Sequence, residues 1–561
     1  MLTEVAGEIV LPKIMASMID SGIGAEVAGL GTGYILSRAL LMIACICIMI
    51  IGGIGGHFFA IRASVYFSAD LRQGVFEKVQ NFSFKNIDNF STGSLVTRLT
   101  NDITQVQNMV RMLLIMAMRS PGMLIGGIIM ACSINKDLVL ILAFVIPILA
   151  VLIRLLLKTA FPRFGAMQKK LDNLNSGIQE NITNVRVIKS FVRQDFETEK
   201  FENANSDLMN TTMRALKIVI TTMPIMTLAM NITTLLVVWF GGNFVVGGSM
   251  GVGDLTAFTT YITQILMSLM MVSMLFLQLS RALASSTRIT EVLKTDVDLT
   301  DENAGQKDKK VENGRVEFKN VSFKYYEKRK ENVLENISFT AEPGEIVGII
   351  GTTGSGKSSL VQLIPRLYDV TDGEVLVDGV NVKDYGLKNL RDGVGMVLQK
   401  NVLFSGTIYE NIRWGDETAS DEEVKRVCKL AQADGFVQEF PNGYNTKIVQ
   451  GGNNVSGGQK QRLCIARALL KKPKILILDD STSAVDTKTD ALIRKAFREE
   501  IPNTTKIIIA QRVSSIEDAD QIIVLDGGQI MGIGTSEELL KTNEIYREVY
   551  ESQVKGGGDH E

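Results

Sequence analysis

The sequence predicts a helical membrane domain of six transmembrane helices followed by an α/β domain with a phosphate-binding loop. Hydrophobic residues make up 46% and charged residues 21% of the 561 residues, which is apolar for a soluble protein. The long apolar runs all lie before about residue 290. After residue 310 the pattern is that of a soluble α/β domain, and Gly351–Ser358 fits the phosphate-binding loop motif.

Several apolar runs are long enough for the about 20 residues that a helix needs to cross a bilayer. They are Ile35–Ile61, Met112–Cys132, Leu138–Leu157, Ile218–Phe240 and Leu255–Leu279. A further run, Met1–Ile19, is shorter and contains Glu4, Glu8 and Lys13. We therefore expect it to be the second half of a first span, with the chain starting inside that helix.

The placement of basic residues predicts the orientation of the spans. Arg62–Arg111 holds six Lys and Arg residues and Arg154–Lys217 holds eleven, whereas the three short connections together hold only Lys136. The two long basic loops should therefore be cytoplasmic, and so should the α/β domain. Both loops are rich in helix formers, so we expect the helices to continue well beyond the bilayer.

Aromatic residues at the tips of these two loops predict contacts with another domain. Ser83–Phe90, with Phe82 beside it, and Phe191–Phe201 both mix aromatic and charged residues. Clustered aromatic side chains are poorly placed in water. This favours short docking helices over solvated loops.

Ionisable residues in the apolar runs leave two interpretations open. Glu4 and Glu8 lie four residues apart and share one helix face, and Arg119 lies in the third span. At membrane depth such groups face a wet cavity or pair with each other. The two acids could contact cationic cargo, or they could form an ion pair with Arg119.

Methionines are concentrated in the fifth and sixth spans. Their flexible thioethers would suit a cavity for varied apolar ligands, or they would simply fill packing gaps. The candidate cargo residues are Glu4, Glu8, Met223, Met226, Met267, Met270 and Met274. On the second span, the glycines of Gly52–Gly56 permit close approach of another helix.

The chain divides into four parts. They are a membrane domain at 1–294, a linker at 295–313, the α/β domain at 314–555 and a tail at 556–561. We expect the linker to be exposed, because it is charged and lacks apolar periodicity. The net charge of −2 gives no bias toward nucleic acid, and the five cysteines have no zinc-site spacing.

The phosphate-binding loop has both of the neighbours that the motif requires. Ile346–Ile350 is a short apolar strand before it, and a helix pattern follows from Leu360. Lys357 would reach the β- and γ-phosphates, and Ser358 would bind Mg²⁺. The predicted contacts of an ATP molecule in this loop are Gly351, Thr352, Thr353, Gly354, Ser355, Gly356, Lys357, Ser358 and Ser359.

A second buried strand, Ile475–Leu478, is followed by two acids. Asp479 lies where a carboxylate that organises the metal ion is expected. The next position normally supplies a base or polariser for the attacking water, and here it is Asp480, one methylene shorter than Glu. A misplacement of about 1 Å can slow a reaction on the order of a hundredfold.

With Val455–Gln459 beside these motifs, the chain resembles one half of a heterodimeric ABC exporter of the multidrug type. The resemblance covers nearly the whole chain and matches Ser83–Phe90 and Phe191–Phe201 to the coupling helices of the family. It implies that the signature motif consists of Ser456, Gly457, Gly458 and Gln459, and that Tyr325 stacks on adenine. It also implies that Gln399 contacts Mg²⁺ together with Ser358 and Asp479. Ser483–Asp486 would form the D-loop, and Gln511 stands at the position of the switch His.

The resemblance also implies a partner. In this family two nucleotide domains sandwich two ATP molecules, and each site joins the phosphate loop of one chain to the signature motif of the other. Asp480 and Gln511 stand where a catalytic Glu and His are expected, so this chain's own site should bind ATP and hydrolyse it poorly. Its signature motif can complete a competent site on a different half-transporter, so we expect a heterodimer.

The predicted function is ATP-driven efflux of apolar or amphipathic compounds across the plasma membrane, which we expect to be bacterial. A lipid or peptide exporter would have a similar sequence. An ATP-gated channel or regulator is an alternative, because an impaired site would prolong the dimerised state. The spans and the lack of a basic face count against a soluble ATPase that acts on nucleic acid.

Overall fold

In the computed structural model the chain forms two compact units. The described residues are 1–23, 30–326, 331–481 and 484–555. The first unit, here called the membrane unit, consists of Met1–Lys78 and Thr92–Lys294. The second, the nucleotide unit, consists of Val79–Ser91 and Thr295–Glu561, so one short segment of the N-terminal half belongs with the C-terminal half.

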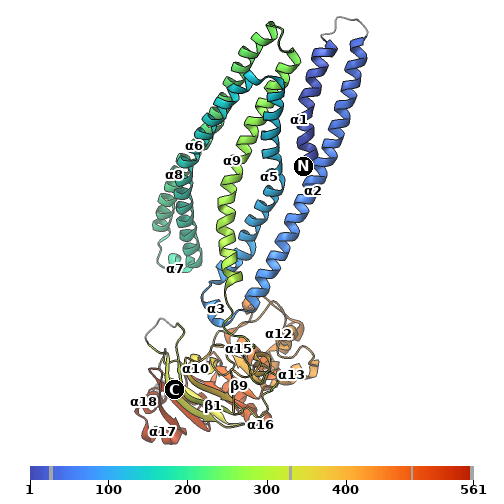
Figure 1. Ribbon diagram of the computed structural model, residues 1–561. Helices are drawn as coiled ribbons and strands as arrows, with labels where there is room; N and C mark the ends of the chain where they lie inside the picture. The colour runs from blue at the N-terminus through green and yellow to red at the C-terminus, as the bar shows by residue number, and fades with distance from the viewer. Residues whose placement is uncertain (24–29, 327–330, 482–483, 556–561) are drawn as a thin grey trace. The chain divides into compact units, whose positions relative to one another are not determined.

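Long helices make up the membrane unit (Figure 1). Their bounds are α1 (Leu2–Ser17), the π-helix η1 (Met18–Ile23), α2 (Leu30–Gln80), α4 (Thr92–Thr97), η2 (Arg98–Asp102), α5 (Ile103–Ile134), α6 (Lys136–Thr183), α7 (Val185–Ser190), α8 (Gln194–Val246) and α9 (Val252–Lys294). Helix α6 has 48 residues, or roughly 70 Å at about 1.5 Å per residue, which is over twice the thickness of a hydrocarbon core. The helices therefore extend well beyond a bilayer, as predicted.

Within the described residues, five helices are long and apolar enough to cross a membrane. They are Gly31–Gln80, Thr92–Ile134, Lys136–Thr183, Pro224–Val246 and Val252–Val272. Each overlaps one of the full spans predicted from the sequence. The predicted first span falls in α1, whose 16 residues cover about 24 Å and fall short of a core of about 30 Å.

Helix α1 packs closely against α2 and α5 through glycines. A Cβ atom on Gly52 would lie 1.9 Å from Thr3 Oγ1, and one on Gly126 would lie 2.1 Å from Ile9 Cδ1. The close approach predicted for Gly52–Gly56 is therefore confirmed. Helices α5 and α9 run side by side, and so do α6 and α8 (Figure 1).

The end of α1 is tied to the start of α9. The carboxylate of Asp20 accepts hydrogen bonds from the backbone N–H groups of Gly253 (2.7 Å) and Asp254 (3.1 Å). Lys13 forms a salt bridge with Asp254 at 2.9 Å. A Cβ atom on Gly253 would lie 2.3 Å from the carbonyl oxygen of Ala16. The absence of a side chain at this position lets the two helices meet.

The strands belong to the nucleotide unit. Their bounds are β1 (Val316–Phe323), β2 (Leu334–Ala341), β3 (Ile346–Gly351), β4 (Asp372–Val377), β5 (Val380–Asn381), β6 (Val394–Val397), β7 (Gly406–Thr407), β8 (Lys447–Ile448), β9 (Ile475–Asp479), β10 (Thr505–Ile509), β11 (Gln521–Asp526) and β12 (Gln529–Gly534). Within the described residues, six strands form one sheet in the order β12-β11-β3-β10-β9-β6, parallel except for β11–β12. A four-stranded antiparallel sheet has the order β2-β1-β4-β5.

Helices of the nucleotide unit connect and cover these strands. Their bounds are α3 (Phe84–Asp88), α10 (Lys357–Gln362), α11 (Leu387–Gly393), α12 (Ile408–Arg413), α13 (Asp421–Leu430), α14 (Asp434–Glu439), η3 (Gly443–Asn445), η4 (Gln450–Gly452), α15 (Gly457–Leu470), α16 (Thr487–Glu500), η5 (Val513–Ser515), α17 (Ser536–Thr542) and α18 (Glu544–Lys555). Strands β3 and β9 are both neighbours of β10 and parallel to it. Their carboxyl ends meet at one edge of the sheet, where ligands of open α/β sheets bind.

Most residues of segment 295–313 are exposed, as predicted for a linker, but two apolar side chains also anchor the segment to the nucleotide unit. Leu299 and Val311 are each 7% exposed, and Gln306 pairs with Tyr385 in a parallel bridge. Single apolar anchors of this kind create no helix or strand periodicity. The sequence pattern therefore missed the contact.

Segment Ser83–Phe90 contacts the nucleotide unit, as predicted. The hydroxyl group of Tyr368 donates a hydrogen bond to Asp88 Oδ2 at 2.7 Å, and the ring centroids of Phe84 and Tyr368 lie 6.0 Å apart. The aromatic side chains at the other tip, Phe191–Phe201, are exposed. Docking of that second segment stays a prediction.

We expect Tyr368→Phe to loosen α3 without unfolding the nucleotide unit. The substitution keeps the ring contact with Phe84 but removes the hydrogen bond to Asp88, worth about 1 kcal/mol. Hydrogen–deuterium exchange of the α3 amides should become about fivefold faster. Tyr385→Phe is the control, because the Tyr385 hydroxyl group donates to the carbonyl oxygen of Val377 instead. Equal exchange of α3 in the two variants would contradict the contact.

Candidate nucleotide-binding site

The phosphate loop connects β3 to α10 and is shaped by glycines. Gly354 and Gly356 have φ angles of +87° and +93°, in the left-handed region that other residues rarely adopt. A Cβ atom on Gly356 would also lie 2.9 Å from the carbonyl oxygen of Val333. Residues Thr352–Gly356 therefore form a tight turn between the buried strand β3 and the helix α10, which is the context that the motif requires.

Lys357 begins α10, and its ammonium group folds back over the loop. Nζ donates to the carbonyl oxygens of Gly351 (2.8 Å) and Thr352 (2.7 Å). Burial lowers the pKa of Lys357, and the carboxylates of Asp480 and Asp479 oppose this effect. A phosphate group in the loop would replace neutral carbonyl oxygens with a charged and stronger acceptor.

Lys357→Met should weaken ATP binding to this loop about 10- to 100-fold, because a charge-assisted hydrogen bond contributes about 1.5–3 kcal/mol. Titration of the full-length chain with a fluorescent ATP analogue measures the dissociation constant. Lys388→Met, at an exposed position of α11, is the matched control and should bind like the unmodified chain. The same dissociation constant in both variants would remove Lys357 from the site.

Asp479 and Ser358 meet at the shared edge of the sheet. The hydroxyl group of Ser358 donates to Asp479 Oδ1 at 2.9 Å. Burial raises the pKa of Asp479, and the hydrogen bond from Ser358 opposes this effect. Hydroxyl and carboxylate oxygens are the ligands that Mg²⁺ prefers, usually shared with substrate phosphates. The pair therefore fits Mg²⁺, and the described residues contain no group of three His, Cys, Asp or Glu that could hold a metal ion by itself.

Asp480 follows β9 directly and has a left-handed φ of +48°. Gln511 Nε2 donates a hydrogen bond to Asp480 Oδ2 at 2.7 Å. Burial raises the pKa of Asp480, whereas hydrogen bonds from Gln399 and Gln511 and the charge of Lys357 lower it. Two amides thus bind the carboxylate at the position where a general base would act.

Tyr325 lies beside the phosphate loop. Its hydroxyl group shares a hydrogen bond with Ser359 Oγ at 2.8 Å, and its ring is perpendicular to that of Tyr368, with centroids 5.1 Å apart. Burial raises the pKa of Tyr325. The ring that the resemblance assigns to adenine is therefore packed into the unit here. No motif marks Tyr368 in the sequence, and only its packing identifies it as part of this region.

The signature motif forms the start of α15. The Ser456 hydroxyl group accepts from the N–H of Gln459 (3.3 Å), and Gln459 Oε1 accepts from the N–H of Ser456 (2.9 Å), which is a capping box. A Cβ atom on Gly458 would lie 2.7 Å from the carbonyl oxygen of Ala484 in the predicted D-loop; Ser483 lies outside the described residues. Within the described part of the chain, no hydrogen bond joins the signature motif to the phosphate loop.

In the membrane unit, the two acids of α1 bind Arg119 of α5. Nη1 donates to Glu4 Oε1 at 2.9 Å and Nη2 donates to Glu8 Oε1 at 2.6 Å. Of the two interpretations that the sequence leaves open, the structure shows the ion pair. This pairing offsets part of the cost of burying charge between helices.

The predicted cargo methionines do not share one environment. Met226 is buried in the helical core, Met270 packs against that core and Met267 is exposed. The side chains of Met223 and Met274 lie outside the described residues. The described methionines therefore include packing residues as well as an exposed one.

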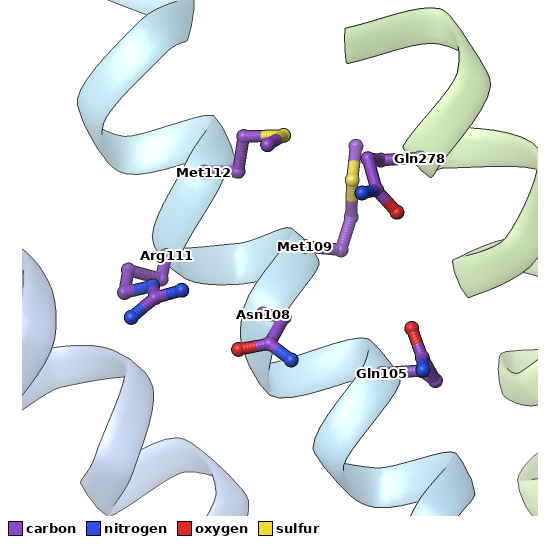
Figure 2. A pocket seen from close by; sticks show the side chains of 6 residues that line it. All are labelled: Gln105, Asn108, Met109, Arg111, Met112 and Gln278. Atoms are coloured by element: carbon purple, nitrogen blue, oxygen red, sulfur yellow. The ribbon is translucent and has the colours of Figure 1, made fainter. Parts of the chain in front are cut away.

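A cavity of about 280 Å³ lies between α5 and α9 (Figure 2). Its lining residues are Gln105, Asn108, Met109, Arg111, Met112 and Gln278. None of the predicted cargo residues is among them. The lining combines amides and a guanidinium group with thioethers, so it offers both polar and apolar surface. The available signal was the spacing of Gln105, Asn108 and Met112 on one helix face where the third span begins.

Comparison with known families agrees with this architecture. Residues 2–269 match the family described as "ABC transporter transmembrane region", and residues 334–483 match the family described as "ABC transporter". A helical transmembrane domain followed by an ABC nucleotide-binding domain defines a half-transporter of the ABC exporter class, which is an ATP-driven, multi-pass membrane protein. The chain belongs to the ABC transporter family.

Individual relatives cover nearly the whole chain. It is 42% identical to "Uncharacterized ABC transporter ATP-binding protein YfiB" of Bacillus subtilis (strain 168), over 99% of this chain and 95% of the relative. It is 34% identical to "Putative multidrug export ATP-binding/permease protein YgaD" of the same organism, over 86% of this chain and 83% of the relative. The solved "Structure of a bacterial Atm1-family ABC exporter with ATP bound" has a TM-score of 0.85 and 25% identity, covering 99% of this chain and 98% of that one. The predicted fold class and exporter class are thereby confirmed.

Proposed function

We propose that this chain is one half of a heterodimeric exporter of amphipathic compounds in the plasma membrane. Its own site would bind ATP with Mg²⁺ and hydrolyse ATP slowly, and its signature motif would complete a faster site on a different half-transporter. The observation that carries the proposal is the hydrogen bond from Gln511 to Asp480, placed beside an otherwise intact phosphate loop.

The side chains at these two positions are poorly suited to hydrolysis. A carboxylate that activates water needs a free oxygen aimed at that water, and Asp480 is shorter than Glu and accepts hydrogen bonds from two amides. Gln511 has no titratable proton, whereas the charge of His changes near neutral pH. Lys357, Ser358 and Asp479 retain the groups that bind phosphate and Mg²⁺, so these features support ATP retention with slow turnover.

The signature motif is available to a second chain. Ser456 and Gly457 are exposed, and the capping box already satisfies the side chains of Ser456 and Gln459 locally. Backbone N–H groups at the start of α15, which has 14 residues, are suited to phosphate oxygens. This arrangement supports a site shared between two chains.

Each unit also exposes apolar side chains that a partner would cover. On the nucleotide unit, Phe404 (43% exposed) and Trp414 (63% exposed) stack with ring centroids 4.1 Å apart. On the membrane unit, Phe191 (72% exposed) and Val192 (79% exposed) lie at the tip of the loop between α7 and α8. These surfaces support a stable partner subunit.

The lining of the cavity between α5 and α9 supports the proposed cargo class. Polar groups such as Gln105 and Arg111 lie with the thioethers of Met109 and Met112 (Figure 2). An amphipathic molecule would satisfy both kinds of surface. Glu4 and Glu8 are bound by Arg119, which disfavours them as a dedicated site for cations.

Co-purification tests the assembly. The chain would be expressed with any half-transporter encoded beside it, and ATPase activity would be measured for each chain and for the pair in lipid vesicles. We expect low activity for this chain alone and high activity for the pair. Rapid ATP turnover together with transport by this chain alone would contradict the proposal.

A further inference from the structure

The C-terminal helix α18 holds the loop that carries Gln511. Gln553 Nε2 donates to the carbonyl oxygen of Gln511 at 2.8 Å, and Gln553 Oε1 accepts from the N–H of Val513 at 2.8 Å. One side-chain amide thus satisfies an acceptor and a donor on the same backbone segment, as a neighbouring strand would. We call residues 510–513 the switch loop.

Both ends of the switch loop are held by the surrounding structure. The N–H of Ala510 still donates to the carbonyl oxygen of Ile349 in the six-stranded sheet, at 3.2 Å, and η5 begins at the buried residue Val513. Gln511 and Arg512 therefore form the whole connection. The path of these two residues decides where the Gln511 side chain points.

Helix α18 is itself anchored to the nucleotide unit. Tyr546 is fully buried, and its hydroxyl group shares a hydrogen bond with Ser536 Oγ at 2.8 Å. Val549 and Tyr550 pack against the same core. Their spacing of three and four residues places Gln553 on the same helix face. The amide of Gln553 is therefore presented from a rigid support.

We propose that Gln553 is a positioning residue for the switch loop, which it holds so that the Gln511 side chain stays on Asp480. The C-terminal helix thereby sets the geometry next to the phosphate loop, although Gln553 itself touches neither phosphate loop nor signature motif within the described residues. Any effect of Gln511 on ATP hydrolysis rests on the proposed function. The contact between Gln553 and the switch loop is independent of the proposed function.

Amide exchange tests the contact in the otherwise unmodified full-length chain. Gln553 is exposed, so Gln553→Ala leaves the core intact. We expect hydrogen exchange of the Val513 amide to become about tenfold faster in Gln553→Ala, while exchange of the β10 amides stays unchanged. Gln553→Glu keeps the acceptor for Val513 and should keep the protection. Gln529→Ala, which removes an exposed amide bound to Glu335, is the control; Val513 exchange equal to the control in Gln553→Ala would overturn the proposal.

Kinetics test the positioning role. In the full-length pair carrying Asp480→Glu and Gln511→His, adding Gln553→Ala should lower kcat at this site about tenfold and change KM by less than about twofold, because the loop is displaced while the phosphate loop is not. Gln553→Glu should also lower kcat, since it loses the donor to the carbonyl oxygen of residue 511. An unchanged kcat, or a kcat that falls only together with thermal stability, would overturn the positioning role.

The two experiments separate this proposal from the proposed function. If Asp480→Glu with Gln511→His gains no activity, the account of the slow site fails. Exchange at Val513 still decides whether Gln553 holds the switch loop. If activity is gained but does not respond to Gln553, only the positioning role fails.

Discussion

Replacing Asp480 with Glu and Gln511 with His is expected to raise ATP turnover at this chain's own site on the order of a hundredfold. Glu extends the carboxylate by one methylene toward the attacking water. The double substitution also removes the amide that now binds Asp480 Oδ2. His supplies a titratable group at the second position.

The measurement uses the full-length pair with the partner's catalytic Glu replaced by Gln. The remaining ATP hydrolysis then comes from this chain's own site. Gln511→His alone is the matched control and should gain much less, because Asp480 would still be too short. Equal rates for the single and double variants would assign the slow turnover to other residues of the site.

Arg119→Leu is expected to destabilise the membrane unit by up to about 3 kcal/mol, less than removing one partner from a fully buried ion pair, because this pair is partly buried. Glu4 and Glu8 would be left without their shared guanidinium group, and both of its hydrogen bonds would be lost. Thermal unfolding of the chain in lipid nanodiscs measures the change.

A triple variant, Glu4→Gln with Glu8→Gln and Arg119→Leu, is the control. It removes the charges together and should recover most of the lost stability, since a buried ion pair contributes little relative to neutral residues of similar size. If Arg119→Leu melts at the same temperature as the unmodified chain, the ion pair is not part of the packed core.

Motifs whose backbone geometry is set by sequence could be predicted well. Gly354 and Gly356 must adopt left-handed angles, and the apolar runs of β3 and β9 must be buried. These local requirements fix the phosphate loop and the position of Asp479 without knowledge of the rest of the chain. The spans follow from length and hydropathy for the same reason.

Contacts between single residues far apart in sequence could not be predicted where no motif marks either partner. Tyr368 meets Asp88 across 280 residues, and Gln553 meets Gln511 across 42. A single tyrosine or glutamine has no periodicity and no fixed spacing to its partner. The choice between cargo contact and ion pair for Glu4 also depended on where α5 packs, which only the fold determines.

The link between Asp20 and the first turn of α9 constrains how the exporter can release its cargo. Two hydrogen bonds from backbone N–H groups of α9 to the Asp20 carboxylate, together with the Lys13–Asp254 salt bridge, join α9 to α1 and η1 on the side predicted to face outward. Separating them would expose unsatisfied N–H groups and break an ion pair in the same movement. Any movement that parts α1 from α9 must therefore break all three contacts together, so these contacts favour movement of the two helices as one unit.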